Sequence, residues 1–237
     1  MTTCLWWVRP EAIQSSPATL ALLSDDERQQ QQRYLSPLKR HEHLATRVLV
    51  RSLLGDALGV APASLQFVHN EWGRPALAPA SSPAPVHFNL SHTDGLIVCL
   101  VSSQYQVGVD TELLVRAPEL LALGPDVFAA KELNDIAALP LEEQAQRAVV
   151  LWTLKESYIK ARGMGLALPL DGFAFRFADG RISLELEPSV SDDGLCWQFQ
   201  TQIMGQHCIS LAISSPAGER LAVEIKEWPG MDGRRPF

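Results

Sequence analysis

Apolar residues recur at helical spacing in two long segments of this 237-residue chain. In the first, leucines and valines return every three or four residues and predict a helix over about residues 39–58, which Gly59 ends. In the second, the same spacing predicts an amphipathic helix over 142–163. A shorter helix is predicted to begin at Ser24, because a serine followed by three acidic residues is typical of a capped helix start.

Short apolar or alternating runs predict strands between and after these helices. They lie at residues 64–69, 86–89, 96–101, 106–112, 173–177, 182–186, 196–203, 208–213 and 221–225. Helices followed by strands occur twice, without strand–helix alternation, which favours an α+β fold over a doubly wound parallel sheet. The two halves have a similar order of elements, and we expect subdomains at 1–115 and 116–237.

Composition narrows the class of protein. The chain is 46% hydrophobic, which is typical of a globular protein. It has no apolar run of about 18 residues, so we expect no membrane helix, and its start lacks the pattern of a secretory signal. Four scattered cysteines without a CxxC pair predict free thiols in a reducing cytoplasm: Cys4, Cys99, Cys196 and Cys208.

Charge is unevenly distributed along the chain. The net charge of -7 disfavours non-specific binding to nucleic acid. Residues 28–51 nevertheless hold six lysines and arginines against one acid, whereas residues 119–143 hold six acids against one lysine. This asymmetry indicates an anionic ligand bound by the N-terminal half. A solvated helix face explains the basic segment equally well.

The predicted strand at 106–112 carries two acids on one face. Side chains alternate along a strand, so Gly108, Asp110 and Glu112 share one side, with backbones of the two acids about 7 Å apart. Two carboxylates at this distance suit Mg²⁺, which also takes waters and phosphate oxygens as ligands. Taken alone, such a pair more often belongs to an exposed strand face on which both acids are solvated.

A second candidate lies on the predicted helix at 142–163. Glu156 and Lys160 are neighbours at i,i+4, and Lys155 lies about 100° round the helix but can reach the same cleft on its long stem. A carboxylate between two ammonium groups can bind a metal or accept a proton while the lysines neutralise phosphate. The alternative is an ordinary salt-bridged helix, although Trp152 and Tyr158 are costly to leave in water.

A third candidate is the pair Ser91 and His92, which we place at a strand end before a turn. No GxSxG motif is present, so a nucleophile–base pair is not indicated. Hydroxyl and imidazole donors at a strand end suit phosphate contacts. A polar turn without a ligand explains the pair equally well.

Four segments in this order resemble the 4'-phosphopantetheinyl transferases of the surfactin-synthetase-activating (Sfp) type. They are Gly73–Pro75, Phe88–His92, Gly108–Glu112 and Trp152–Lys160. Each motif is modest alone, but four in the same order are specific, and the likeness extends from about residue 24 to 213. Arg74 stands where the family often has lysine, which keeps the charge and changes its geometry.

The resemblance implies two similar α+β subdomains related by a pseudo-twofold axis, each a small mainly antiparallel sheet on helices, with coenzyme A bound between them. By position in the motifs, the residues fall into three groups. Asp110, Glu112 and Glu156 match metal-binding acids; Ser91, His92, Lys155 and Lys160 match contacts to the phosphates of the coenzyme; Gly73, Arg74 and Pro75 match a stretch near the nucleotide.

The function implied is that of a holo-[acyl-carrier-protein] synthase type of transferase. It moves 4'-phosphopantetheine from coenzyme A to a serine of an acyl or peptidyl carrier protein, depends on Mg²⁺ and releases adenosine 3',5'-bisphosphate. We expect Glu156 to act as base, Lys155 and Lys160 to stabilise the transition state, and Lys39, Arg40 and Arg47 to bind the 3'-phosphate. We also expect a monomer. A non-catalytic binding module for coenzyme A or a nucleotide, or a Mg²⁺-dependent phosphohydrolase, remains an alternative.

Overall fold

The computed structural model describes residues 3–81, 85–188, 190, 194–216 and 219–231. One order of elements occurs twice: a strand, helices, a hairpin of two short strands, and two longer strands. The first half holds β1 (Thr3–Val8), α1 (Pro17–Leu20), α2 (Asp25–Arg33), α3 (Pro37–Leu58), β2 (Phe67–His69), β3 (Pro75–Leu77), β4 (His87–Thr93) and β5 (Leu96–Ser102). The second holds β6 (Val107–Leu113), α4 (Ala117–Leu123), α5 (Ala130–Ala138), α6 (Leu141–Arg162), β7 (Phe173–Ala178), β8 (Arg181–Leu186), β9 (Cys196–Met204) and β10 (His207–Ser215), before β11 (Val223–Glu227).

The strands of the two halves pair in the same way, which confirms the α+β class and the two similar halves. In the first sheet, ordered β11-β1-β5-β4, β5 runs antiparallel to both β1 and β4. In the second, ordered β6-β10-β9, β10 runs antiparallel to both β6 and β9. The predicted division of the chain near residue 115 stays a prediction. A division there would place β6 in the first half, although β6 pairs with β10 in the sheet of the second half.

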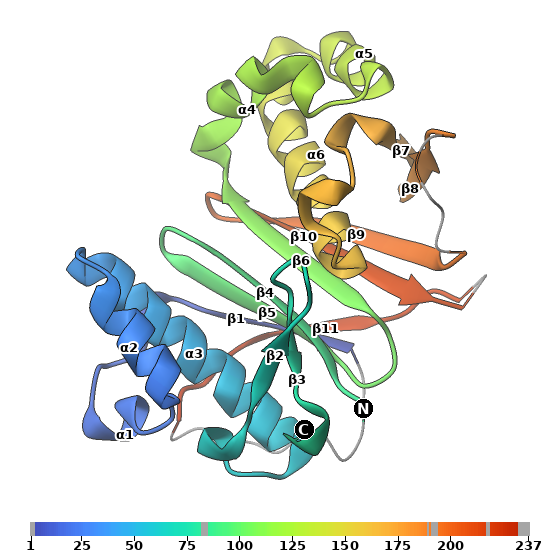
Figure 1. Cartoon of the computed structure of the whole chain (residues 1–237). Coiled ribbons are helices and arrows are strands. Elements are labelled where there is room, and N and C mark those ends of the chain that lie inside the picture. Colours follow the sequence, from blue (N-terminus) through green and yellow to red (C-terminus); the bar gives the residue numbers. More distant parts are fainter. Residues whose placement is uncertain (1–2, 82–84, 189, 191–193, 217–218, 232–237) are drawn as a thin grey trace.

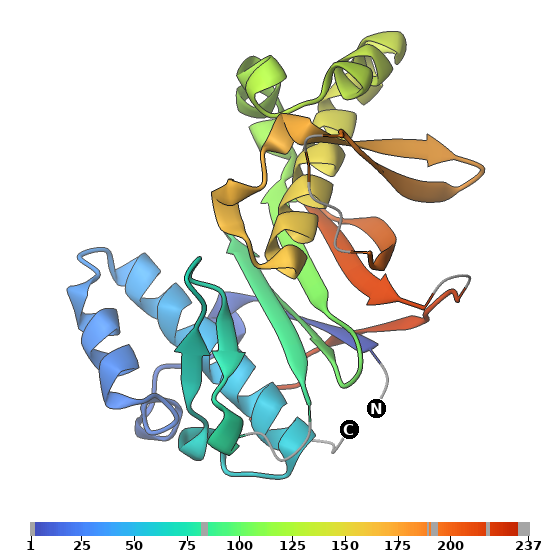
Figure 2. The same ribbon diagram turned by 45° about the vertical axis from the view of Figure 1, so that its right-hand side comes forward.

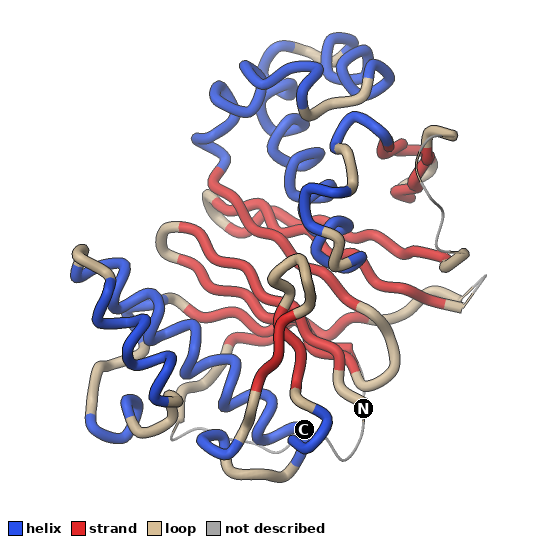
Figure 3. The backbone as a smooth tube through the Cα atoms, viewed as in Figure 1, coloured by secondary structure: helices blue, strands red, loops and turns tan. Residues whose placement is uncertain are grey.

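The two sheets lie in the middle of the molecule with a long helix on the outer side of each (Figures 1 and 2). Apolar side chains of β1, β5, β6 and β10 form one buried cluster, so the sheets share a core. The other face of the first sheet is buried against α3, and that of the second against α6. The tube in Figure 3 shows the strands of these two sheets gathered between the two long helices. Removal of these apolar faces from water is the main stabilising term.

Local sequence signals explain where the long helices begin and end. In α2, Ser24 and Glu27 form the predicted capping box. Ser36 caps α3, and Gly59 ends it in the left-handed region with φ 67°. Gly163 ends α6 in the same way with φ 66°. Both long helices agree with the predicted ranges to within two residues at each end.

Some strands differ from the prediction. β2 is shorter, because residues 62–64 form a 3-10 turn before it. β4 is longer and continues through Thr93, so Ser91 and His92 lie near the end of a strand before a turn, as predicted. β1 and β3 were not predicted, since each short strand depends on a partner supplied by another part of the chain.

Within the described residues, no helix is both long enough and apolar enough to span a membrane. All four cysteines are free thiols; Cys196 is exposed and the other three are buried. Burial raises the pKa of Cys4 to about 11 and also raises the pKa of Cys99 and Cys208. These three thiols therefore act as small core side chains.

A candidate active site at the seam between the two halves

The edges of the two sheets meet where β4 lies beside β6, and we call this line the seam. Alternate side chains of β4 reach across it, as the period of two in a strand requires. Hydrogen bonds across it include those from the Val109 N–H to Asn89 Oδ1 (2.9 Å), from Ser91 Oγ to Asp110 Oδ1 (2.8 Å), and from Thr93 Oγ1 to Glu112 Oε1 (3.1 Å). The seam thus fixes both predicted acids of β6.

α6 crosses the outer face of β6 in very close contact at Gly108. A Cβ atom at this position would lie 2.0 Å from the Ser157 carbonyl oxygen and 2.5 Å from the Ala161 nitrogen. Only glycine allows this approach. It brings the α6 face that carries Lys160 to the seam, where Lys160 Nζ lies 2.6 Å from Asp110 Oδ1.

Glu156, one turn before Lys160, belongs to the same cluster. Burial raises the pKa of Glu156, and the negative charge of Asp110 raises it further, whereas Lys160 acts in the opposite direction. Asp110 itself is only 6% exposed. The charges of Asp110 and Glu156 therefore interact, whereas the predicted convergence of both acids of β6 with Glu156 stays a prediction.

Glu112 shares this face of β6 but has other partners. Arg116 Nη1 donates to its carboxylate at 3.0 Å, and Thr93 and the Leu113 N–H also donate to it. Among the residues that the structure describes, no group of three potential ligands forms a metal site. The carboxylates of Asp110 and Glu156 offer a donor set, and Glu112 as a third metal ligand stays a prediction. Mg²⁺ is commonly held by one or two carboxylates together with waters and substrate phosphates, so these two acids fit it.

Lys155 does not share the cleft of Glu156, and that expectation is wrong. Its ammonium is fully buried, lies 2.8 Å from Glu132 Oε2 and donates to the carbonyl oxygens of Leu170 and Phe173. Burial lowers the pKa of Lys155 and raises that of Glu132, while each partner's charge opposes the shift in the other. The 100° turn between adjacent helix residues directs Lys155 into the core of the second half.

Arg74 holds the end of α6. Its guanidinium donates to the carbonyl oxygens of Ala161 (2.6 Å) and Val107 (3.2 Å), and Asn70 Nδ2 donates to the Gly163 carbonyl oxygen (2.7 Å). The loop between β2 and β3 therefore satisfies carbonyl groups that the helix end leaves unpaired. In this loop Gly73 has φ 82° and Pro75 begins β3. Contacts of Gly73, Arg74 and Pro75 with a nucleotide stay predictions.

Glu42 on α3 is a residue that sequence reasoning missed. It is buried, and its Oε1 lies 3.3 Å from Nδ1 of the exposed His92, while its Oε2 accepts a bond from Lys39 Nζ at 2.8 Å. A carboxylate at Nδ1 fixes the imidazole ring and directs Nε2 away from the helix. Glu42 stood out in the sequence only as the single acid of a basic segment.

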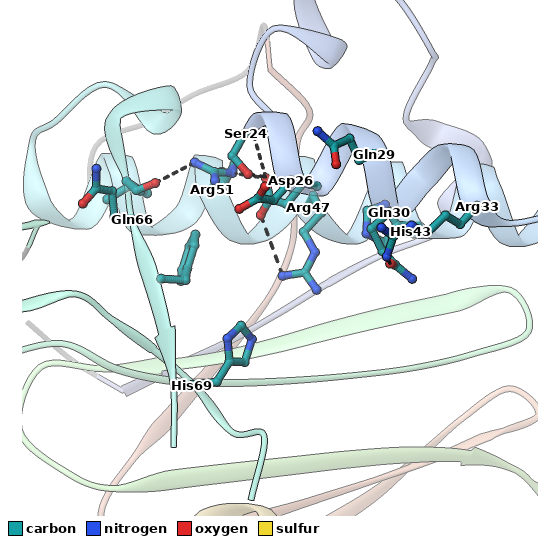
Figure 4. Close-up of a pocket in the computed structure, with 13 residues that line it drawn as sticks. Ser24, Asp26, Gln29, Gln30, Arg33, His43, Arg47, Arg51, Gln66 and His69 are labelled. Carbon is teal, nitrogen blue, oxygen red and sulfur yellow. Dashed lines mark hydrogen bonds and ion pairs between the residues drawn. The ribbon is translucent and has the colours of Figure 1, made fainter. Parts of the chain in front are cut away.

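A cavity of about 720 Å³ lies between α2, α3 and β2 (Figure 4). Arg33, His43, Arg47 and His69 line it together with Glu27 and Gln30. Among the described residues, neither His43 Nδ1 nor Arg47 Nε has a hydrogen-bond partner, although both atoms are buried. Of the three predicted 3'-phosphate contacts, Arg47 lines this cavity. Lys39 binds Glu42, and Arg40 donates to the Tyr34 carbonyl oxygen.

Comparison with known proteins shows the family of the chain. The family described as the 4'-phosphopantetheinyl transferase superfamily matches residues 106–212, and the family described as 4'-phosphopantetheinyl transferase, N-terminal, matches residues 9–105. The chain belongs to the 4'-phosphopantetheinyl transferase superfamily.

Individual relatives are similar over most of their length. The chain is 34% identical over 208 residues to 4'-phosphopantetheinyl transferase HetI of Nostoc, covering 87% of this chain and 84% of that protein. It is 32% identical over 184 residues to 4'-phosphopantetheinyl transferase Sfp of Bacillus subtilis, covering 77% and 80%. The solved holo-[acyl-carrier-protein] synthase of Neisseria meningitidis matches 47% of this chain and 98% of its own, with 15% identity and a TM-score of 0.42.

Proposed function

We propose that this protein transfers the 4'-phosphopantetheine group of coenzyme A to a serine of an acyl or peptidyl carrier protein. The similar relatives are named for this transfer. In the chain itself, the proposal rests on the cluster at the seam. There Lys160 lies 2.6 Å from Asp110, and the charge of Asp110 raises the pKa of Glu156. Carboxylates that hold a cation beside an ammonium group suit a pyrophosphate substrate.

Each residue of the cluster has a role in the proposed reaction. The serine oxygen forms a bond to the phosphorus next to pantetheine, and the bond from that phosphorus to the leaving adenosine 3',5'-bisphosphate breaks. Glu156, directly or through a water, accepts the serine proton, since its carboxylate belongs to the charged cluster at the seam. Lys160 and Ser91 donate to the phosphate oxygens. When bound by Asp110 and Glu156, Mg²⁺ supplies charge neutralisation on the pyrophosphate.

The nucleotide end of coenzyme A is proposed to enter the cavity beside α3. Arg47 offers positive charge there, and among the described residues Arg47 Nε and His43 Nδ1 have no hydrogen-bond partner. His92 lies on the seam side of α3, beside Glu42 and Lys39. We therefore expect Arg47 to contact the 3'-phosphate directly. Lys39 and Arg40 stay predictions for the same group.

Transfer is tested by incubation of the protein with coenzyme A, Mg²⁺ and a panel of apo carrier proteins. A carrier that gains the mass of one phosphopantetheine arm supports the proposal. Release of phosphopantetheine without a carrier would indicate a phosphohydrolase instead, and binding of coenzyme A without transfer to any carrier would indicate a binding module.

We also propose that the protein works as a cytoplasmic monomer that binds neither nucleic acid nor membrane. The net charge of -7 and the four free thiols support this setting. Sedimentation at several protein concentrations tests the monomer.

A further inference from the structure

We propose that Lys160 competes with the divalent cation for Asp110, so that this protein binds metal weakly until a phosphate ligand draws Lys160 away. The inference rests on the proposed function, because it takes Asp110 and Glu156 as the metal ligands. It assigns Lys160 a second role, that of a built-in cation which keeps the acids of the seam neutralised between reaction cycles.

The geometry of Asp110 supports competition. Its Oδ1 accepts from Lys160 Nζ at 2.6 Å and from Ser91 Oγ at 2.8 Å, and Nζ lies 3.0 Å from the same Ser91 oxygen. Both donors therefore act on one carboxylate oxygen. A metal ion needs that carboxylate at about 2.0–2.1 Å. If the ion takes either oxygen while Lys160 stays, two cations share one carboxylate in a nearly buried site and repel each other.

Lys160 is able to leave. Its side chain is 29% exposed, in contrast to the fully buried Lys155. A lysine ammonium on a four-carbon stem also binds phosphate well as a point charge. A pyrophosphate at the seam would give Lys160 new anionic partners and give the metal additional oxygen ligands. Metal binding and phosphate binding should then strengthen each other by the same factor, as linkage requires.

The first test is calorimetric titration with Mn²⁺ alone, without coenzyme A. Mn²⁺ is a suitable probe because it prefers the same carboxylate and water ligands as Mg²⁺. We expect K160M to bind Mn²⁺ about tenfold or more tightly than the wild type, within the usual range of coupling between sites. K160R keeps a cation beside Asp110 and should bind as weakly as the wild type.

R162Q is the matched control for charge. It removes one positive charge two residues further along α6, where Arg162 Nη1 binds the Tyr158 hydroxyl rather than Asp110. We expect R162Q to stay within about threefold of the wild type, because Arg162 is bonded to Tyr158 and salt screens its charge from the seam. Equal affinity of K160M and the wild type, or an equal gain in R162Q, would overturn the proposal.

A second measurement keeps the test independent of variant folding. NMR of wild-type protein with ¹³C-labelled lysine should show the Lys160 side-chain signal move when Mg²⁺ is added, and no other lysine signal move as far. A Lys160 signal that stays fixed at saturating Mg²⁺ would contradict displacement. Both experiments use neither coenzyme A nor a carrier, so they can fail while the transferase proposal stands, and the transfer assay can fail while they succeed.

Discussion

α3 and α6 each have 22 residues and each carry one buried cation 14 residues after the first residue of the helix: Arg51 in α3 and Lys155 in α6. The partner acid comes from the preceding helix in both cases. Arg51 Nε lies 2.7 Å from Glu27 of α2, and Lys155 Nζ lies 2.8 Å from Glu132 of α5. The two halves therefore repeat the same buried ion pair.

The surroundings of the two ion pairs also correspond. Arg51 donates to two carbonyl oxygens in the segment after α3, and Lys155 does so in the segment after α6. Arg51 lies over the Phe67 ring at 5.2 Å, and Lys155 over the Phe173 ring at 4.3 Å. A feature present in both halves serves the fold that they share. This is why Lys155 is a structural residue.

The halves differ on the strand face that each long helix covers. Leu5 of β1 and Val109 of β6 hold the same place, because each pairs with the strand of its sheet that runs antiparallel to both neighbours, at Leu100 and Leu211. On the neighbouring positions that face the helix, β1 carries Cys4, Trp6 and Val8. β6 carries Gly108, Asp110 and Glu112 at the same places. In the first half these positions are apolar, and Trp6 and Val8 join the core beneath α3. In the second they are polar and meet Lys160 and Glu156. The candidate site therefore lies where the second half differs from the structure that the two halves share.

The largest expected effect is a loss of stability, and it should be greater for the more deeply buried of the two ion pairs. K155M leaves Glu132 buried without a counter-charge and should lower the free energy of unfolding by about 3–5 kcal/mol. R51M should cost less, because the side chain of Glu27 is 13% exposed, whereas that of Glu132 is 0% exposed. The double variant K155M/E132Q should recover a large part of the loss. Urea unfolding measures all three, and a K155M cost below about 1 kcal/mol would contradict a buried ion pair.

Next in size is the loss of the seam carboxylate. D110N keeps the shape of Asp110 and a hydrogen-bond acceptor but removes the charge that pairs with Lys160. We expect kcat/KM for transfer to a carrier to fall by about 10²–10³-fold, the usual cost of one electrostatic contact in an active site. Its Tm should stay near that of the wild type. Transfer at the wild-type rate would remove Asp110 from the site.

A smaller effect tests the contact of α6 with β6. G108A places a methyl group 2.0 Å from the Ser157 carbonyl oxygen, so α6 must move. We expect a loss of about 1–3 kcal/mol in stability together with slower transfer, since Glu156 and Lys160 move with the helix. C4A changes the corresponding position of the first half and should leave transfer unchanged. Equal losses of transfer rate in G108A and C4A would contradict a specific role of the seam in the reaction.

The smallest effect concerns pH. The pKa of Glu156 is raised in the folded state, so the folded protein holds this proton more tightly than the unfolded chain. The resulting stability is complete below the unfolded pKa of glutamate, about 4.3, and is lost as pH rises through the folded-state pKa. In metal-free buffer, E156Q should therefore become more stable than the wild type as pH rises. A difference in Tm that does not change with pH would be contrary to this account.

Local signals in the sequence predict much of the helix and strand structure that the two halves share. The cap at Ser24 and the left-handed glycines after α3 and α6 fix the helices, because these interactions involve residues only a few positions apart. The period of two correctly places Gly108 and Asp110 on one face of β6. The i,i+4 spacing likewise places Glu156 and Lys160 together.

Long-range pairing explains what the sequence could not predict. β1 pairs with β5 and β11, about a hundred and about two hundred and twenty residues away, so its own residues carry no clear strand signal. The Glu132–Lys155 ion pair and the Glu42–His92 contact join different elements through tertiary packing. Which of the two lysines of α6 is buried and which lies at the seam depends on which face of the helix α5 and β7 cover. No spacing within the helix contains that information.

The most direct measurement compares transfer rates of variants at the two lysines of α6, at a temperature where circular dichroism shows each to be folded. We predict that K155M/E132Q transfers phosphopantetheine to an apo carrier within about tenfold of the wild-type rate, whereas K160M is slower by about 100-fold or more. A K160M rate near the wild type together with an inactive, folded K155M/E132Q would contradict a chemical centre at the seam.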